Sequence, residues 1–271
     1  MENAYSPLNI EKIKQNLKTK YIGKNLIFLE SIDSTNLEAK RLINKDIENG
    51  TLIIAEEQTL GKCRFSDRKW RSPKYKGLWM SLILKPHIEP NLLPLITQLA
   101  AASITYSFNT QNDIKAFIKW PNDIILNNKK LVGILTELSL DSFNEPNIIL
   151  GIGINVSQNF DDFSKEISNK ATSLAIELNK PVSREIVLTY FLNDFERFYD
   201  NFMHTKDSQN FLKICKKNSI LIGKDIEITR KNKTISAKAV DINNSGELVI
   251  MFKDGHTENL ISGEVTLNKF Y

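Results

Sequence analysis

The sequence is poor in the residues that form metal sites and disulfides. It contains only two cysteines, Cys63 and Cys215, which are too far apart in the chain to act as a local metal-binding pair, and three scattered histidines. No zinc-ligand spacing and no Ser/His/Asp arrangement is present, which argues against zinc-dependent and hydrolytic chemistry. So low a cysteine content predicts a reduced, cytoplasmic protein.

Long hydrophobic runs and a large charge imbalance are also missing. No apolar run approaches the ~18 residues of a transmembrane helix, and the N-terminal residues do not form a secretory signal. Lys and Arg total 36 and Asp and Glu total 32, so the formal net charge is only +4 and no polybasic stretch occurs. We therefore expect neither a membrane nor a nucleic acid as a partner.

What is present is an ordinary globular composition, with 41% hydrophobic and 25% charged residues in a chain of 271. Segments typical of strands and of helices follow one another up to about residue 220. After Gly223 the texture changes to short strands separated by polar turns. The pattern predicts an α+β fold, with a mixed sheet and helices in a domain over residues 1–220 and a small β-barrel domain over residues 221–271.

Individual elements can be placed from periodicity and turn residues. Strands are expected at 26–30, 51–57, 77–86, 116–120 and 147–156, a hairpin at 124–138, and helices at 92–108, near 171 and at 183–203. Thr35 and Glu38 form a capping-box pattern, which predicts a helix start there. Residues 58–76 have no periodicity and are expected to form a long loop, a kind of segment that is often functional.

Two segments carry side chains suited to binding phosphate. The expected loop places Lys62 and Arg64 after Gly61, and backbone N–H groups with guanidinium groups suit phosphate oxygens. In the segment 119–123, Lys119 can neutralise phosphate, Asn122 can donate and accept hydrogen bonds, and Asp123 can hold Mg²⁺. Taken alone, either segment could also be an ordinary solvated surface.

A third segment is the strand that begins at Lys130. Gly133 in this strand would let a ligand approach the backbone closely. A single lysine on a strand is more often a solvated edge residue, and the glycines of 151–156 match no phosphate-loop fingerprint. Neither segment identifies a ligand without the others.

The order in which these segments occur is more specific. The residues Ser34-Thr35-Asn36, the loop 61–70, the segments 119–123, 130–137, 151–156 and 172–174, and Gly263–Leu267 follow one another along the chain. In this combination the sequence resembles the biotin–protein ligase (biotin–[acetyl-CoA-carboxylase] ligase) family over roughly residues 26–271. The resemblance implies a catalytic domain like that of class II aminoacyl-tRNA synthetases, followed by an SH3-like β-barrel. It also implies the ligase-only class, without a DNA-binding domain.

The resemblance implies a reaction in two steps. Biotin and ATP, with Mg²⁺, would give biotinyl-5′-AMP and pyrophosphate, and the biotinyl group would then pass to a lysine of a biotin carboxyl carrier protein or domain. The family resemblance also allows a homodimer. Joining two anions, a carboxylate and a triphosphate, requires fixed positive charge in the site.

The resemblance also assigns residues to roles. The biotin-binding residues would be Ser34, Thr35, Asn36, Gln58, Gly61, Lys62, Arg64, Lys130 and Gly133. The nucleotide-binding residues would be Lys119, Trp70, Asn122 and Asn155, with Trp70 either against the adenine or in the core. Asp123 would bind the metal, and Lys130 and Arg64 would be catalytic.

The loop departs from the family pattern at two positions. Cys63 stands where the family has a glycine, and Ser66 makes the loop one residue longer. We therefore expect a different loop path, and a non-catalytic biotin-binding protein is one alternative. A lipoate–protein ligase, which shares the fold, is another. A biotin-responsive DNA-binding repressor would need a winged helix, for which the residues before the first strand are too few.

Overall fold

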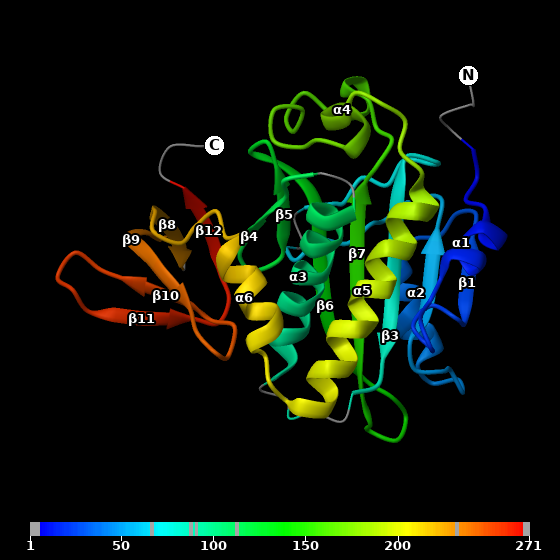
Figure 1. Cartoon of the computed structure of the whole chain (residues 1–271), viewed down its shortest axis with the longest axis horizontal. Coiled ribbons are helices and arrows are strands. Elements are labelled where there is room, and N and C mark those ends of the chain that lie inside the picture. The colour runs from blue at the N-terminus through cyan, green and yellow to red at the C-terminus, as the bar shows by residue number, and fades with distance from the viewer. Residues whose placement is uncertain are drawn as a thin grey trace.

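The computed structural model describes residues 6–65, 68–86, 89, 92–111, 114–230 and 233–267. In this part of the chain the larger sheet has seven strands in the order β1-β2-β3-β7-β6-β5-β4 (Figure 1). The first pair, β1 and β2, is parallel, and all other neighbours are antiparallel. The bounds are β1 Leu26–Leu29, β2 Thr51–Ala55, β3 Gly77–Leu84, β4 Phe117–Lys119, β5 Asp123–Leu126, β6 Lys129–Leu140 and β7 Pro146–Asn155.

Helices cover both faces of this sheet. α3 (Leu93–Gln111) and α5 (Arg184–Thr205) lie across the face that is toward the viewer in Figure 1, and α6 (Gln209–Lys217) lies beside α3. α2 (Thr35–Leu42) packs on the opposite face. Its apolar side chains form a small cluster with Ile53 and Ile83, whereas the neighbouring Leu52 and Leu82 belong to the main core. Because strand side chains alternate between faces, the two clusters lie on opposite sides of the sheet.

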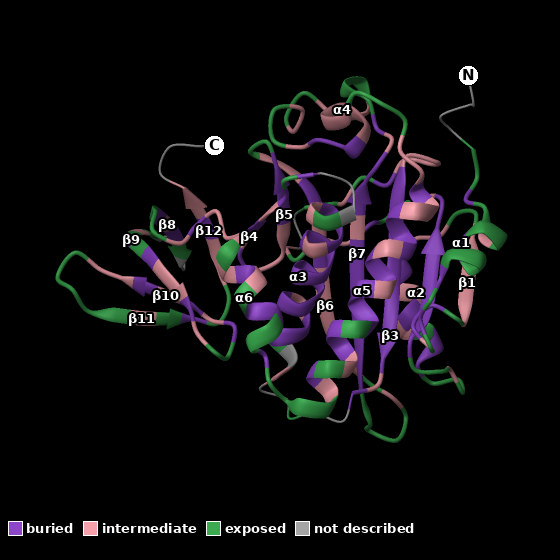
Figure 2. Cartoon of the chain, in the orientation of Figure 1, coloured by how far each residue is buried: buried purple, intermediate pink, exposed green. Residues whose placement is uncertain are grey.

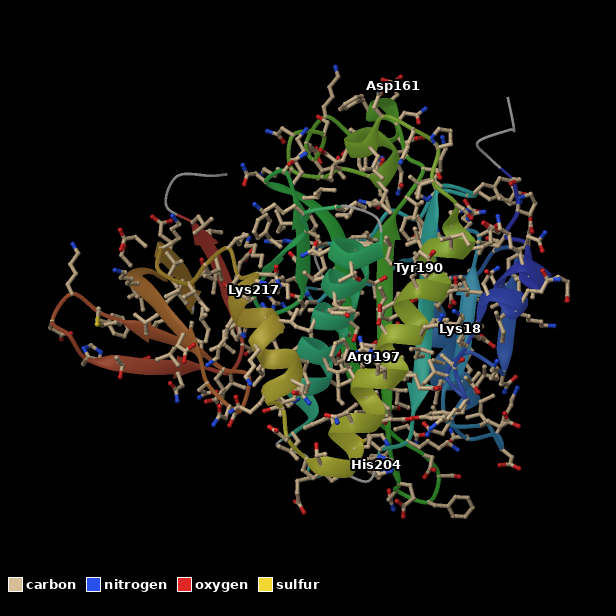
Figure 3. All side chains as sticks on the ribbon, in the orientation of Figure 1. Lys18, Asp161, Tyr190, Arg197, His204 and Lys217 are labelled. Carbon is tan, nitrogen blue, oxygen red and sulfur yellow. The ribbon has the colours of Figure 1, made fainter. Side chains whose placement is uncertain are left out.

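α5 illustrates how the sequence pattern produces the packing. Phe191 and Phe195 are fully buried beneath the helix, as the periodicity predicts. Tyr190, Arg197 and His204 lie along its outer side (Figure 3). The apolar face of α5 is therefore core (Figure 2). The remaining short helices are α1 Ile10–Asn16, α4 Leu174–Leu178 and the 3₁₀ turn Phe160–Asp162.

The C-terminal strands form a second, antiparallel sheet in the order β11-β10-β9-β8-β12. The bounds are β8 Asp225–Arg230, β9 Lys233–Ile242, β10 Leu248–Met251, β11 Thr257–Leu260 and β12 Glu264–Leu267. Its buried side chains join the same core cluster as the main sheet, and Trp120 Nε1 donates to Gly246 O at 2.9 Å. The small β unit is confirmed as a separate sheet, whereas the division into two domains at residue 220 remains a prediction.

The predicted strands, hairpin and helices are confirmed with small shifts of their ends. Asn127 and Asn128, at φ 47° and 63°, form the predicted hairpin turn. β3 is buried along its whole length because helices cover both of its faces. α6 has no counterpart among the predicted elements. None of the helices in the described ranges is both long and apolar enough to cross a membrane.

The predicted capping box at the start of α2 is wrong. The N-cap is Ser34, one residue earlier, and Thr35 already lies inside the helix. The Thr35 hydroxyl contacts Gln58 and the strand below instead of capping the helix. Glu38 pairs with Arg41 in the next turn at 2.9 Å. Tertiary contacts have taken the Thr35 side chain, and a contact within the same helix has taken that of Glu38.

Candidate active site

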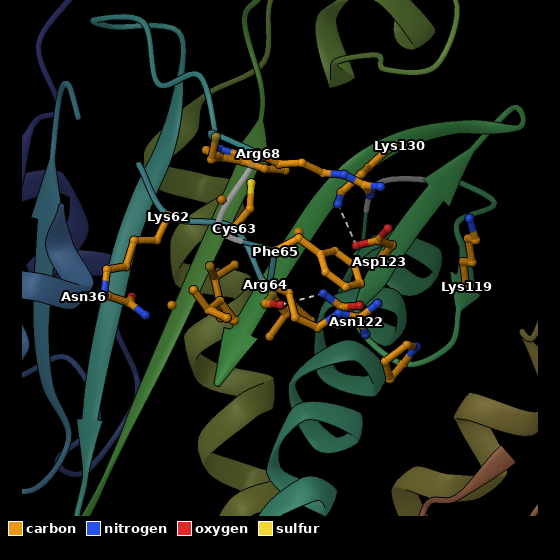
Figure 4. A pocket seen from close by; sticks show the side chains of 18 of the residues that line it. Asn36, Lys62, Cys63, Arg64, Phe65, Arg68, Lys119, Asn122, Asp123 and Lys130 are labelled. Carbon is orange, nitrogen blue, oxygen red and sulfur yellow. Dashed lines mark hydrogen bonds and ion pairs between the residues drawn. The ribbon is translucent and has the colours of Figure 1, made fainter. Parts of the chain in front are cut away.

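A cavity lies on the α2 side of the larger sheet, bordered by the loop between β2 and β3 (Figure 4). Its empty volume is about 930 Å³, which includes open solvent at its mouth. Twelve of the residues nominated from the sequence line it: Ser34, Thr35, Asn36, Gln58, Lys62, Arg64, Trp70, Lys119, Asn122, Asp123, Lys130 and Gly133. Of the nominated residues, Gly61 and Asn155 do not.

One end of the cavity, which we call the neutral end, is formed by Ser34, Thr35, Asn36 and Gln58. Thr35 N donates to Gln58 Oε1 at 2.9 Å, and Gln58 Nε2 donates to Ser72 Oγ at 2.9 Å. Because a backbone N–H can only donate, the Gln58 amide has one orientation. Ser34, Thr35 and Asn36 are 1%, 2% and 4% exposed. The neutral end is therefore a packed, hydrogen-bonded wall.

A half-buried carboxylate lies behind this wall. Glu137 on β6 accepts from Asn36 Nδ2 and from Lys40 Nζ, each at 2.7 Å, and Lys62 Nζ lies 3.6 Å away. Burial acts to raise the pKa of Glu137, but the hydrogen bonds from Lys40 and Asn36 outweigh it and lower that pKa. Glu137 is therefore held as a carboxylate at neutral pH.

The other end, which we call the charged end, gathers Lys119, Asp123, Lys130 and Arg64 (Figure 4). Lys130 Nζ lies 2.7 Å from Asp123 Oδ1. The Asn122 side chain donates from Nδ2 to a carbonyl of β6 at 2.8 Å. Partial burial lowers the pKa of Lys119, and the nearby Lys130 and Arg64 act in the same direction, against the carboxylate of Asp123. Such a group of neighbouring cations is suited to an anionic ligand.

Glycines form the floor between the two ends. Gly133 on β6 and Gly153 on β7 are directly opposite each other in the sheet. A Cβ atom on Gly133 would come within 2.7 Å of the Trp70 ring, and one on Gly153 within 2.5 Å of Trp70 Nε1. Trp70 therefore rests on backbone in the cavity wall, with its ring edge-on to Trp79 at 6.4 Å between centroids.

The loop closes on itself at its base. Trp70 N donates to Gly61 O at 3.0 Å, and Lys62 pairs with Lys69 in an isolated bridge. A Cβ atom on Gly61 would lie 2.3 Å from Trp70 O. Gly61 thus allows the close approach of the two loop ends, which explains why it does not line the cavity.

The two departures from the family pattern fall within this loop. Cys63 lines the cavity and is not among the described non-glycine residues with positive φ. It therefore occupies the glycine position without the strain that positive φ would impose on a cysteine. Ser66 lies outside the described residues.

The tip of the loop reaches the second sheet. Arg64 Nη2 donates to Gly263 O at 2.8 Å, and Arg68 Nη1 lies 2.8 Å from Glu264 Oε1. The ring of Phe65 lies between the two arginines, whose guanidinium carbons are 4.9 and 5.0 Å from its centroid. Glu264 and Val265 also line the cavity, so the C-terminal sheet forms part of its wall.

Comparison with known proteins identifies the family. A model described as the biotin/lipoate A/B protein ligase family matches residues 28–155, and one described as the biotin protein ligase C-terminal domain matches residues 221–267. The bifunctional ligase/repressor BirA of Bacillus spizizenii is 36% identical over 260 residues, which are 96% of this chain and 79% of that protein. The chain belongs to the biotin/lipoate protein ligase family.

Solved structures of this family share the fold. Biotin protein ligase from Aquifex aeolicus, in complex with biotin and ATP, aligns with a TM-score of 0.77 at 30% identity, over 90% of this chain and 99% of that chain. The biotin–[acetyl-CoA-carboxylase] ligase of Mycobacterium tuberculosis is 28% identical over 172 residues, which are 59% of this chain and 60% of that protein. The predicted family and fold class, a mixed sheet with helices and a small C-terminal β unit, are confirmed.

The cavity wall also includes residues that the sequence analysis did not nominate: Cys63, Phe65, Arg68, Met80, Trp120, Pro121, Ile134, Leu135, Gly151, Ile152, Gly153, Glu264 and Val265. Most lie inside segments that carried the resemblance. Glu264 is the most informative omission, because it belongs to the other sheet and nothing in its local sequence indicates that it faces Arg68.

Asn155 lies beside the cavity, 5% exposed, with its amide already engaged. Its Nδ2 donates to Thr172 O at 3.0 Å, and its Oδ1 accepts from Gln158 Nε2 at 2.8 Å. These bonds fix the segment after β7 against the start of α4. The predicted contact between Asn155 and a nucleotide remains a prediction.

Proposed function

We infer that this chain is a biotin–protein ligase that converts biotin and ATP to biotinyl-5′-AMP and then biotinylates a protein lysine. One observation carries the inference. A single cavity joins a neutral hydrogen-bonding pocket to a cluster of cations, as a reaction between a ureido vitamin and a nucleotide requires. The match to the biotin-specific C-terminal model favours biotin over lipoate within the family.

In the first step the biotin carboxylate attacks the α-phosphorus of ATP. A carboxylate–phosphorus bond forms, the bond to the β-phosphate oxygen breaks, and pyrophosphate leaves with the electron pair. The two reactants are anions that repel each other. Lys130, Lys119 and Arg64 supply the positive charge that lets them meet, and Lys130 lies where the charged end adjoins the floor.

The neutral end holds the ureido ring in this proposal. Ser34, Thr35, Asn36 and Gln58 present polar atoms there, and Lys62 borders them. Gly133 lets the Trp70 ring lie against the backbone, beside the proposed ligand. Trp70, Asn122 and Lys119 are assigned to the nucleotide. Arg64 acts in both steps by covering the adenylate.

The residues at the charged end also fit Mg²⁺. Magnesium is usually held by one or two carboxylates together with substrate phosphates, with water completing the shell. Asp123 and Glu264 are carboxylates on the cavity wall. The described residues contain no group of three His, Cys, Asp or Glu that could hold a metal without a ligand. Asp123 would therefore hold Mg²⁺ together with phosphate oxygens, where the ion would neutralise developing negative charge.

In the second step a lysine amine attacks the biotinyl carbonyl, an amide forms, and AMP leaves. The lysine belongs to a biotin carboxyl carrier protein or domain in this proposal. The loop whose Arg68 pairs with Glu264 covers the adenylate between the two steps in this proposal, and it excludes water from a reactive anhydride. The homodimer allowed by the family resemblance remains a prediction.

The direct test is pyrophosphate release from ATP on addition of biotin, followed by transfer of labelled biotin to a carrier domain. Lipoate replaces biotin in a parallel reaction. Release with biotin and not with lipoate supports the proposal. Release with lipoate alone would identify a lipoate–protein ligase, and biotin binding without release would identify a non-catalytic binding protein.

A further inference from the structure

Ser81 is a polar residue in the middle of the apolar strand β3. It is fully buried and does not line the cavity. Its Oγ lies 2.6 Å from Asn36 Oδ1 and 2.7 Å from Thr35 Oγ1, two residues of the neutral end. A buried hydroxyl that is hydrogen-bonded to two cavity residues restricts how the side chain of each can turn.

The direction of these hydrogen bonds follows from counting hydrogens. Glu137 can only accept, so the Asn36 amide turns its NH₂ toward Glu137 and its oxygen toward Ser81. The amide oxygen can only accept, so the single hydrogen of Ser81 is donated to Asn36. Ser81 then has no hydrogen left for Thr35.

One partner takes the hydrogen of the Thr35 hydroxyl. It is donated to Ser81 Oγ, because an O···O contact of 2.7 Å needs a hydrogen between the two oxygens and the hydrogen of Ser81 is already donated to Asn36. Gln58 Oε1 lies further away, at 3.1 Å, and already accepts from Thr35 N. Thr35 therefore offers a ligand oxygen lone pairs, and the neutral end accepts a hydrogen bond at this residue.

Gly151 keeps Asn36 in this position. A Cβ atom on Gly151 would lie 2.1 Å from Asn36 Oδ1 and 2.9 Å from its Nδ2. The amide therefore lies flat on the β7 backbone, between Ser81 on one side and Glu137 on the other. There is no room for the Asn36 side chain to turn over while these neighbours stay in place.

We propose that Ser81 and Glu137 are positioning residues that set the direction of the chain Glu137–Asn36–Ser81–Thr35, so that Thr35 selects a ligand N–H. Neither residue touches the ligand, and both act through residues that line the cavity. The inference rests on the proposed function, in which that N–H belongs to the biotin ureido ring. The hydrogen-bond direction explains why the site would bind a ring N–H at this position more tightly than an oxygen.

The first test is Ser81→Ala, compared with Ser103→Ala. Ser103 is an equally buried serine on α3 that donates within its own helix, so the matched variant reports the cost of losing a buried hydroxyl elsewhere. Ser81→Ala is expected to raise the KM for biotin roughly three- to tenfold, the usual effect of one hydrogen bond. The KM for ATP and kcat should stay within about twofold of wild type, because the charged end is not altered.

The second test measures selectivity, which a purely structural role would not change. The kcat/KM of the wild-type enzyme is measured with biotin and with analogues in which one ring N–H is replaced by oxygen. A site that accepts from an N–H should reject the matching analogue strongly, on the order of 10³-fold or more. In Ser81→Ala the Thr35 hydroxyl can turn, so the discrimination should fall at least tenfold. Unchanged discrimination in Ser81→Ala would overturn the inference.

Glu137, on β6, provides a second pair of variants that leaves the buried strand β3 unchanged. Glu137→Gln keeps an oxygen acceptor for Asn36 and should retain the discrimination against the analogue. Glu137→Met removes the acceptor at similar length and should lose it. Equal selectivity in the two variants would contradict the proposal. If the wild-type enzyme itself releases no pyrophosphate with biotin, the proposed function fails, which is a separate result.

Discussion

The two ends of the cavity are built in opposite ways. At the neutral end, Ser34, Thr35 and Asn36 are almost completely buried, and hydrogen bonds fix the Thr35 and Asn36 side chains. At the charged end, the side chains of Lys130 and Asp123 remain 34% and 21% exposed, and Arg64 is exposed. At the neutral end, protein partners satisfy the hydrogen bonds of these side chains without a ligand. At the charged end, water still solvates the charged side chains.

The difference has a physical reason. Neutral hydrogen-bonding groups can be buried at little cost once they are paired with each other. Several cations cannot be buried together without an anion, since desolvation and repulsion both oppose it. The charged end is therefore still partly open to water, and Arg64 and Arg68 line the cavity there.

The largest effect should come from Lys130→Ala. Losing a charge-assisted contact to the reacting anions costs about 2–4 kcal/mol, a 30- to 1000-fold reduction in rate. Biotin-dependent pyrophosphate release measures it, and thermal unfolding checks that the fold survives, because the partly exposed pair with Asp123 contributes little stability. Lys129→Ala is the control, since Lys129 does not line the cavity. A loss under threefold would show that Lys130 is not the central cation.

Arg64→Ala should have a smaller effect, on retention of the intermediate. Removing the hydrogen bond to Gly263 O frees the loop tip, and one such bond is worth about 1–2 kcal/mol, or roughly tenfold in the rate at which biotinyl-AMP escapes. Escaped adenylate labels lysines of bystander proteins, so their biotinylation measures the leak. Arg71→Ala is the control, since Arg71 is exposed and does not line the cavity. Bystander labelling at the wild-type level would mean that Arg64 does not retain the adenylate.

Glu264→Gln tests whether the second sheet holds the loop. The pair with Arg68 is partly exposed, so its loss should cost at most about 1 kcal/mol, a two- to fivefold effect on the KM for ATP or on adenylate escape. The KM for biotin should not change, because the neutral end does not contact this pair. Glu258→Gln, on β11 and outside the cavity lining, is the control. A change confined to the KM for biotin would contradict the separation of the two ends.

The smallest effect expected is a change in thiol accessibility. Cys63 lines the cavity and is partly exposed, whereas Cys215 is fully buried and its pKa is raised by that burial. Iodoacetamide should therefore modify Cys63 and spare Cys215. Biotin and ATP together should slow the reaction of Cys63 several-fold as the loop closes over the adenylate. Equal rates with and without the ligands would show that the loop does not close at this residue.

Much of the site could be predicted because its residues lie in a few short segments. The segments 34–36, 119–123 and 130–133 supply cavity-lining residues, and their order along the chain is part of the pattern by which the sequence resembles the family. The role of Gly61 in biotin binding stays a prediction; in the structure Gly61 lies against the Trp70 carbonyl, and a glycine looks the same in sequence whether a ligand or a backbone carbonyl approaches it. Glu137 and Ser81 received no role, because each is joined to the neutral end only by folding.

The sequence by itself determined the family, the alternation of strands and helices, the hairpin at Asn127-Asn128 and the inner face of α5. These depend on periodicity and turn chemistry between residues that are near one another in the chain. Only the tertiary structure decided that Ser34 rather than Thr35 caps α2, that Glu264 faces Arg68, and that Ser81 lies between Thr35 and Asn36. Such contacts join distant segments, and a side chain chooses among polar partners only when packing brings one of them within hydrogen-bonding distance.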